Sequence, residues 1–521
     1  MEKTKKSCYT RRRFLCSCCT MAGAAALAPY MVSCSGAGTQ NKKNCPKVKV
    51  VFGLQQDVQV TPDWPNIGYD MRAEMKAMTD CLNATVPDVE FVPAKSSGEE
   101  QSAAILEKDN AKGGIDGYIV IQLNTGVDAL GGILDNTDKP VLYAQMPYGG
   151  DGVYVQRLAK YLREGAANFA FISAVNFEDV AKVATAFSRL NGGSCSDVVK
   201  AANAIRLEMT PKTPVAKKKA DNLKVLSPEE TLKKLKGRKI LSVEREIDED
   251  YVRKVKELLG VEIERVTLDE VNEETARVDK AAARALCNEW KSKADSIKDV
   301  PDETIFDAAR LYYAMKGILK KHNADSITID CLTGVYSKKL CAYPCLGFMQ
   351  LQDEGLLGIC ENDIDSTLTM MVFGAMTGRM GYISDPVLDS SSRSIIYSHC
   401  VSTRKYFGED GPESPYEILT HSEDRDGASV RVIAPIGYPV TTLKFNFGEG
   451  TMAVHTGTVT GNSKDDRACR TKIIVEVDGD YEKIYRQWDH YIWHRVTFYG
   501  DFAKEAAAFA QKIGFEVRPE C

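Results

Sequence analysis

The chain has 521 residues, with 67 lysines and arginines against 72 aspartates and glutamates, which gives a formal net charge of −5 at pH 7. This length is sufficient for two or three domains, each with its own core. A net negative chain without a basic and aromatic cluster beyond its N-terminus does not favour a nucleic-acid partner.

Residues 1–34 have the composition of an export signal. Consecutive arginines at Arg11–Arg13 precede a short apolar stretch of mostly small residues, a pattern typical of a twin-arginine signal. The segment Met31–Cys34 resembles a lipoprotein processing site and predicts a lipid anchor on Cys34; ordinary cleavage nearby is the alternative. We therefore expect export to the periplasm, or a membrane-anchored lipoprotein with residues 35–46 as its linker.

Residues 47–210 alternate short apolar segments with helical ones. Helical spacing of Met71, Met75, Met78 and Leu82 predicts a helix over 70–83. Strands are expected at 47–54, 89–92, 117–123, 140–145 and 169–173. This alternation predicts a Rossmann-like domain, with a parallel sheet covered on both faces.

Residues 211–390 again alternate strands with helices after a lysine-rich stretch, whereas residues 391–521 consist mainly of strands. In the first of these segments, strands are expected at 238–243, 261–266 and 326–331, with a helix at 303–322. In the second, β-branched strands are expected at 429–436, 439–446, 451–460 and 472–477, with a closing helix at 501–513. We thus expect an α/β protein with two Rossmann-like parallel-sheet domains followed by a C-terminal antiparallel β-rich domain.

Acidic residues and a histidine follow apolar runs in the second half of the chain. Glu361, Asp385 and His399 each come directly after such a run. Ligand sites of parallel sheets gather where strands end, so the three side chains are expected to converge. Taken singly, each residue has a structural alternative: a helix cap for the segment 361–363 and a turn for Asp385.

Histidine is scarce, and five of the six histidines lie after residue 398. His490 and His494 are four residues apart, which on a helix would place both on one metal-binding face. Because residues 495–499 have strand character, we expect His494 to stand at the start of a strand instead. Carboxylates combined with imidazoles suit Mn²⁺, with Zn²⁺, Co²⁺ or Fe²⁺ as competitors.

These residues resemble those of a known enzyme superfamily. The spacing of Glu361-Asn362-Asp363, Thr377-Gly378 and Asp385 resembles the metal-binding segment of L-fucose isomerases. Ser398-His399-Cys400, with His494 far downstream, resembles the L-arabinose isomerases, and residues 494–517 resemble the C-terminal end of that superfamily. The resemblance implies that Glu361 and Asp385 bind the metal and move protons. It also implies that His494 is a third ligand, that His399 is a fourth ligand or lies just behind the ligands, and that the protein is a homo-oligomer.

We therefore predict a metal-dependent aldose–ketose isomerase that moves a proton between C1 and C2 of an open-chain monosaccharide through an enediol. The alternative is a non-catalytic, lipid-anchored carbohydrate-binding protein on the same fold. A nicotinamide-dependent oxidoreductase is disfavoured because residues 52–57 lack the glycine-rich turn of a dinucleotide-binding motif. Residues 448–453 do match the GxGxxA pattern, but they lead into a strand rather than a helix. A serine hydrolase is disfavoured by the absence of a GxSxG motif. Most of the cysteines are expected to be buried free thiols.

Overall fold

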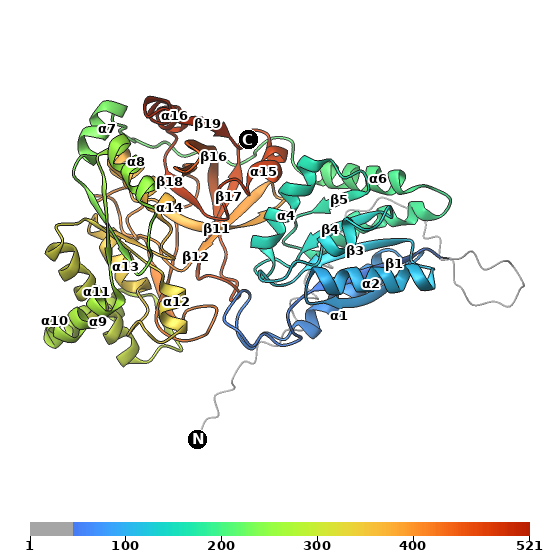
Figure 1. Ribbon diagram of the computed structural model, residues 1–521, viewed down its shortest axis with the longest axis horizontal. Helices are drawn as coiled ribbons and strands as arrows, with labels where there is room; N and C mark the ends of the chain where they lie inside the picture. Colours follow the sequence, from blue (N-terminus) through green and yellow to red (C-terminus); the bar gives the residue numbers. More distant parts are fainter. Residues whose placement is uncertain (1–44) are drawn as a thin grey trace, which may run out of the picture. The chain divides into compact units, whose positions relative to one another are not determined.

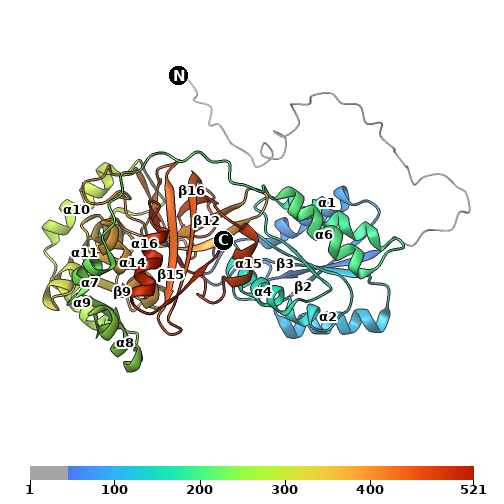
Figure 2. The same ribbon diagram turned by 90° about the horizontal axis from the view of Figure 1, so that it is seen from above.

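The computed structural model describes residues 45–521, so the expected export signal and the lipidation of Cys34 lie outside the described residues. Two parallel sheets with covering helices precede a mainly antiparallel sheet that closes on itself (Figure 1, Figure 2). The predicted order of parallel and then antiparallel structure is confirmed. Among residues 45–521, no helix is both long and apolar enough to cross a membrane.

The first parallel sheet has five strands in the order β2-β1-β3-β4-β5. Alternate residues of β1 face opposite sides: Val50 packs in one cluster with Met75 of α1, and Val51 in another with Tyr154 of α4. The strands are β1 (Lys47–Gly53), β2 (Glu90–Ser96), β3 (Gly117–Gln122), β4 (Val141–Gln145) and β5 (Phe169–Ile172). The helices are α1 (Met71–Thr85), α2 (Glu99–Lys112), α3 (Gly131–Leu134), α4 (Asp151–Glu164), α5 (Phe177–Ala184), η2 (Thr185–Leu190) and α6 (Cys195–Met209).

The second parallel sheet has four strands in the order β10-β9-β6-β7. Its short edge strand β10 leads directly into the acidic segment at residues 361–365. The strands are β6 (Lys239–Val243), β7 (Glu262–Val266), β9 (Ser326–Ile329) and β10 (Leu357–Ile359). The helices are α7 (Pro228–Leu235), α8 (Glu249–Leu259), α9 (Leu268–Arg277), α10 (Lys280–Lys293), α11 (Asp302–Lys321), α12 (Cys331–Tyr336), α13 (Cys345–Asp353) and α14 (Ile364–Thr377).

The third sheet closes because β16 pairs with β15 as well as with β17, in the order β15-β18-β11-β12-β17-β16. The expected domain boundary at residue 390 falls inside this sheet, between β11 and β12. Its strands are β11 (Tyr382–Asp389), β12 (Ser394–His399), β15 (Pro439–Asn446), β16 (Thr451–Asn462), β17 (Thr471–Val477) and β18 (Arg495–Tyr499). The remaining elements are α15 (Tyr481–Gln487), α16 (Ala503–Lys512), β19 (Glu516–Pro519) beside β16, and a small sheet of β14 (Ser429–Val432), β13 (Tyr416–Leu419) and β8 (Ser296–Lys298).

A buried polar network crosses the closed sheet. Arg495 on β18 donates from Nη2 to Glu520 Oε1 at 2.6 Å, and both side chains are fully buried. His455 on β16 bonds through Nδ1 to Glu520 Oε2 at 2.8 Å and through Nε2 to the hydroxyl of Tyr397 at 2.5 Å. Arg495 also donates to the carbonyl of His494 at 3.0 Å. The network therefore fixes the backbone at the start of β18, where His494 lies.

Replacing Arg495 with Met should lower the free energy of unfolding by about 3–5 kcal/mol, because it leaves the Glu520 carboxylate buried without its cationic partner. Chemical denaturation measures this change. Arg518→Met is the matched control: its pairs with Glu449 and Glu516 are partly exposed, and we expect a loss below about 1 kcal/mol. Equal losses in the two variants would contradict the assigned role of the buried pair.

The same network predicts acid sensitivity. Burial opposes ionisation of Glu520, but Arg495 and His455 outweigh it and hold the pKa of this carboxyl at about 2, below its ordinary 4.5. The stabilisation is therefore complete above about pH 4.5 and is lost as the pH falls towards 2. Denaturation of the wild type and of Glu520→Gln between pH 2 and 7 should show the difference between them shrinking over that window.

Candidate functional site

Glu361 and Asn362 form a left-handed turn after β10, with φ angles of 61° and 48°. Left-handed backbone disfavours most side chains, although asparagine tolerates it. The buried amide of Asn362 supports the turn: it donates to the carbonyl of Val243 at 2.8 Å and accepts from the hydroxyl of Ser242 at 3.1 Å. The backbone N–H of Asn362 donates to the carbonyl of Ile329 at 3.1 Å. The turn is thus tied to the ends of β6 and β9, and it fixes the direction of Glu361.

Asp363 has two roles. It is the N-cap of α14, where its side chain accepts from the backbone N–H of Ser366 at 2.9 Å. Its Oδ2 also lies 2.9 Å from Nδ1 of His494 and 2.5 Å from Nζ of Lys444. A carboxylate on Nδ1 fixes the ring orientation and leaves Nε2 as the free donor atom of the imidazole.

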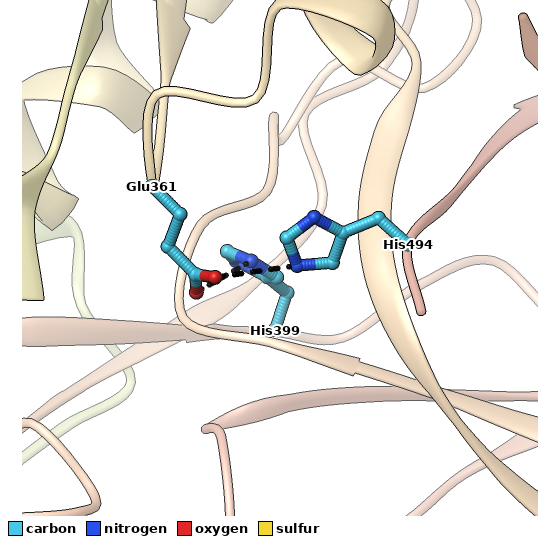
Figure 3. Close-up of side chains that lie close together, drawn as sticks. All are labelled: Glu361, His399 and His494. Atoms are coloured by element: carbon cyan, nitrogen blue, oxygen red, sulfur yellow. Dashed lines mark ion pairs between the residues drawn. The ribbon is translucent and has the colours of Figure 1, made fainter. Parts of the chain in front are cut away.

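The β11–β12 hairpin supplies two further side chains. Asp385 pairs with Ser398 across the hairpin, and His399 is the last residue of β12. Nε2 of His399 lies 3.5 Å from Oε1 of Glu361, and Nε2 of His494 lies 3.4 Å from Oε2 of Glu361 (Figure 3). Oδ1 of Asp385 is 3.4 Å from the same Nε2 of His494. The four expected site residues therefore lie together, although they come from four separate segments.

The donor atoms fit a divalent cation. Ligand atoms of Glu361, His399 and His494 all lie within 4.8 Å of one another. The two histidine Nε2 atoms are buried, and neither has a hydrogen-bond partner within residues 45–521. Ligands held about 2.1 Å from one ion are about 3.0–3.4 Å apart, close to the 3.4 and 3.5 Å between the Glu361 oxygens and the two imidazole nitrogens. Asp385 stands beside this three-residue group and contacts it through His494.

The charges of the site keep Glu361 ionised. Burial alone would raise the pKa of Glu361, but the imidazoles of His494 and His399 outweigh it and lower that pKa. Burial also opposes the charged form of His494, yet Asp385, Glu361 and Asp363 raise its pKa to about 9. Before any cation binds, His494 is therefore protonated at neutral pH.

Asp385 behaves differently from Glu361. Burial is the main cause that raises its pKa to about 6; His494 partly offsets this, and Glu361 adds to it. Two neighbouring carboxyls with pKa values pushed apart are the usual arrangement for one group that stays ionised and one that exchanges a proton near neutral pH.

A cavity of about 410 Å³ opens onto Glu361 and His494. Its volume falls within the range of small-molecule sites. Glu361, Asp363 and His494 line it from the site, and the loops after β6 and before β18 complete its walls. The other lining residues are Arg245, Glu246, Ile247, Asp248, Tyr251, Ile364, Asp365, Ile492 and Trp493.

The structure differs from the sequence expectations in two respects and agrees with them in two others. Asp385 lies inside β11 rather than at the end of a run, because that strand continues through Pro386 to Asp389. The alternative of a turn for Asp385 is therefore wrong, whereas the helix cap expected at 361–363 is confirmed at Asp363. The contact of Asp363 with His494 was missed, since no local pattern connects residues 131 positions apart. His494 directly precedes β18, as expected.

Comparison with known proteins gives partial matches. No family model matches the chain. Sulfoquinovose isomerases of Priestia aryabhattai and Priestia megaterium are each 23% identical over 154 residues, which cover 28% of this chain and 33% of the relative. A sulfoquinovose isomerase of Alkalicoccus urumqiensis is 26% identical over 101 residues, or 19% of this chain and 23% of the relative. The chain thus matches about a third or less of each relative. The similarity is to sugar isomerases in general and does not select the L-fucose or L-arabinose enzymes.

Replacing Asp363 with Asn should weaken binding of the expected Mn²⁺ about 10- to 100-fold, because the amide keeps the helix cap but holds the His494 ring less firmly. Isothermal titration with Mn²⁺ measures the change. The control is Asp365→Asn in the first turn of the same helix, where the carboxylate accepts from Tyr251 and from the N–H of Phe447. Equal affinities for the two variants would contradict the orienting role of Asp363.

Cation affinity should also depend on pH. Because the pKa of His494 is about 9, a cation must displace its proton. We expect affinity to rise roughly tenfold per pH unit between about pH 6.5 and 8, with proton release visible when titrations in buffers of different ionisation enthalpy are compared. Affinity that does not change over this range would exclude His494 as a ligand.

Proposed function

We propose that the protein is a metal-dependent aldose–ketose isomerase acting on a monosaccharide through an enediol. The observation that carries the proposal is the convergence of Glu361, Asp385 and two imidazole nitrogens that have no hydrogen-bond partner among residues 45–521. Glu361 and His494 also line the cavity. The partial similarity to sugar isomerases supports the same reaction class. Mn²⁺ is the proposed metal, held by Glu361, His399 and His494 with Asp385 adjacent.

The two carboxyls suit proton transfer between adjacent carbons. Glu361 stays ionised and can accept a proton from the substrate carbon. Asp385, with a pKa of about 6, is populated in both forms near neutral pH and can give or take a proton. When bound, the cation would supply Lewis-acid stabilisation of negative charge on the sugar oxygens. Asp363 would hold the His494 ring in place during these transfers, and Lys444 contacts Asp363.

Two further features of the proposal come from the sequence. The twin-arginine pattern at residues 1–34 supports export, with Cys34 as the proposed site of a lipid anchor. The resemblance to the isomerase superfamily supports a homo-oligomer. The second candidate function is a lipid-anchored carbohydrate-binding protein without catalysis; the cavity favours it equally, because a cavity serves binding as well as turnover.

The decisive experiment incubates the purified protein with Mn²⁺ and a panel of aldoses that includes sulfoquinovose, L-fucose and L-arabinose. We expect ketose from at least one sugar and none after chelation of the metal. A protein that binds a sugar but forms no ketose from any of them would be the carbohydrate-binding protein. A protein that neither binds nor converts any of them would contradict both functions.

Replacing Glu361 with Gln should lower kcat by at least about 10³-fold while the folded state is retained, since the amide cannot accept the proton. Ketose formation and thermal unfolding measure the two effects. Glu354→Gln is the control: its carboxylate bonds to Tyr312 and Lys316 next to the other end of β10, and its removal should leave kcat unchanged. Full activity of Glu361→Gln would disprove the proposed mechanism.

A further inference from the structure

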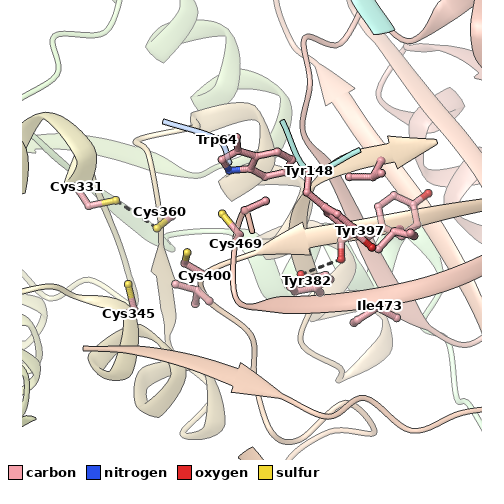
Figure 4. Packing of buried hydrophobic residues seen from close by; sticks show 14 of the residues in the cluster. Trp64, Tyr148, Cys331, Cys345, Cys360, Tyr382, Tyr397, Cys400, Cys469 and Ile473 are labelled. Atoms are coloured by element: carbon pink, nitrogen blue, oxygen red, sulfur yellow. Dashed lines mark hydrogen bonds between the residues drawn. The ribbon is translucent and has the colours of Figure 1, made fainter. Parts of the chain in front are cut away.

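Two buried thiols lie directly behind the proposed metal ligand Glu361. Cys331 is the first residue of α12, and Cys360 stands between β10 and Glu361. Their sulfur atoms are 3.3 Å apart, and the residues are only 4% and 5% exposed (Figure 4). Neither residue has a role in the proposed isomerisation.

The two cysteines extend neighbouring parallel strands. In the β9–β10 ladder Thr328 pairs with Ile359, so the chain segments that carry the cysteines leave the sheet side by side. A disulfide requires sulfur atoms about 2.05 Å apart and Cα atoms about 4.4–6.8 Å apart. Because the sulfurs now lie 3.3 Å apart, they need to approach by about 1.2 Å.

The two neighbours of Glu361 both contact residues 329–331, at the end of β9. On one side, the N–H of Asn362 donates to the carbonyl of Ile329. On the other side, the sulfur of Cys360 contacts the sulfur of Cys331, which follows Ile329 by two residues. Because Glu361 lies between these two contacts, any movement of Cys360 also moves the backbone of Glu361. Metal ligands must keep their distances within about 0.2 Å, so a movement of this size matters to the cation.

We propose that Cys331 and Cys360 form a reversible disulfide whose formation weakens the metal site at Glu361. The co-reactant is a low-molecular-weight or protein disulfide. The two cysteine thiols give up two protons and two electrons as the sulfur–sulfur bond forms, and the co-reactant disulfide is reduced to two thiols. Because both thiols are buried, exchange takes place when the short helix α12 opens locally. The covalent step is independent of the proposed function, whereas its effect on cation binding rests on the proposed metal site.

The test incubates the purified, metal-free chain with oxidised glutathione, followed by alkylation of the remaining thiols, digestion and mass spectrometry without reduction. We expect a peptide pair joined through Cys331 and Cys360, and its loss after dithiothreitol. Both residues found alkylated, after an incubation long enough for exchange of slow backbone amides, would overturn the proposal. A disulfide to a different cysteine would overturn it as well.

Cation binding is measured in parallel on the oxidised and the reduced chain. We expect at least tenfold weaker Mn²⁺ binding in the oxidised form, restored by dithiothreitol. Cys331→Ala should bind Mn²⁺ equally well with or without oxidised glutathione. The control Cys287→Ala removes a buried thiol on α10 whose sulfur contacts the carbonyl of Asp302, and it should behave as the wild type does. If Cys331→Ala does not fold, Cys331→Ser replaces it.

The outcomes separate the two claims. A mapped disulfide with unchanged Mn²⁺ affinity would overturn the coupling to Glu361 and leave the isomerase proposal intact. Absence of Mn²⁺ binding in both redox forms would contradict the proposed metal site, and the disulfide map would still decide whether the thiols react. Weaker Mn²⁺ binding of the oxidised Cys331→Ala variant would also overturn the proposal, because the effect would then come from another thiol.

Discussion

The hydrogen bonds of one buried asparagine set the position of Glu361, on which the proposed metal site depends. Asn362 joins the end of β10 to those of β6 and β9, and it holds Glu361 in a left-handed turn that glutamate alone does not favour. A parallel sheet leaves its polar backbone groups free where the strands end. Asn362 uses these groups to set a carboxylate at a defined place facing the closed sheet.

The closed sheet brings the other half of the site. Its hairpin carries Asp385 and His399, and His494 directly precedes β18, where the buried Arg495–Glu520 pair holds its backbone. The two halves are joined by Asp363, which contacts Lys444 of β15 and His494 while it caps α14. The electrostatic balance of the site therefore depends on both halves. The imidazoles keep Glu361 ionised, and burial keeps the pKa of Asp385 near neutral.

The segment after β10 carries the proposed metal ligand and, on both sides of it, residues that contact the end of β9. Cys360, Glu361 and Asn362 are consecutive, and the first and third of them contact the segment after β9. Glu361 is the proposed metal ligand, and contacts on both sides of it restrain its backbone. Such restraint would favour the proposed catalysis, because displacement of a reacting group by about 1 Å reduces the rate. The same restraint would make the proposed ligand responsive to any covalent change at Cys360. The proposed disulfide and the proposed metal site are thus two consequences of one local arrangement.

Local sequence determined the elements and the residue types. Helical spacing in α1, the apolar strands of the first sheet and the β-branched alternation of β15 to β17 depend on neighbours within a few residues, so the sequence alone predicts them. It also indicated Glu361, Asp385 and His399, because each follows an apolar run, and it indicated His494 as a ligand through the resemblance to the isomerase superfamily. The closure of the sheet through the pairing of β18 with β11 and β15, the place of β11 within it and the contact of Asp363 with His494 were decided only by the tertiary structure. These features join residues up to 131 positions apart, and the free energy that selects them comes from packing the whole chain rather than from any local preference.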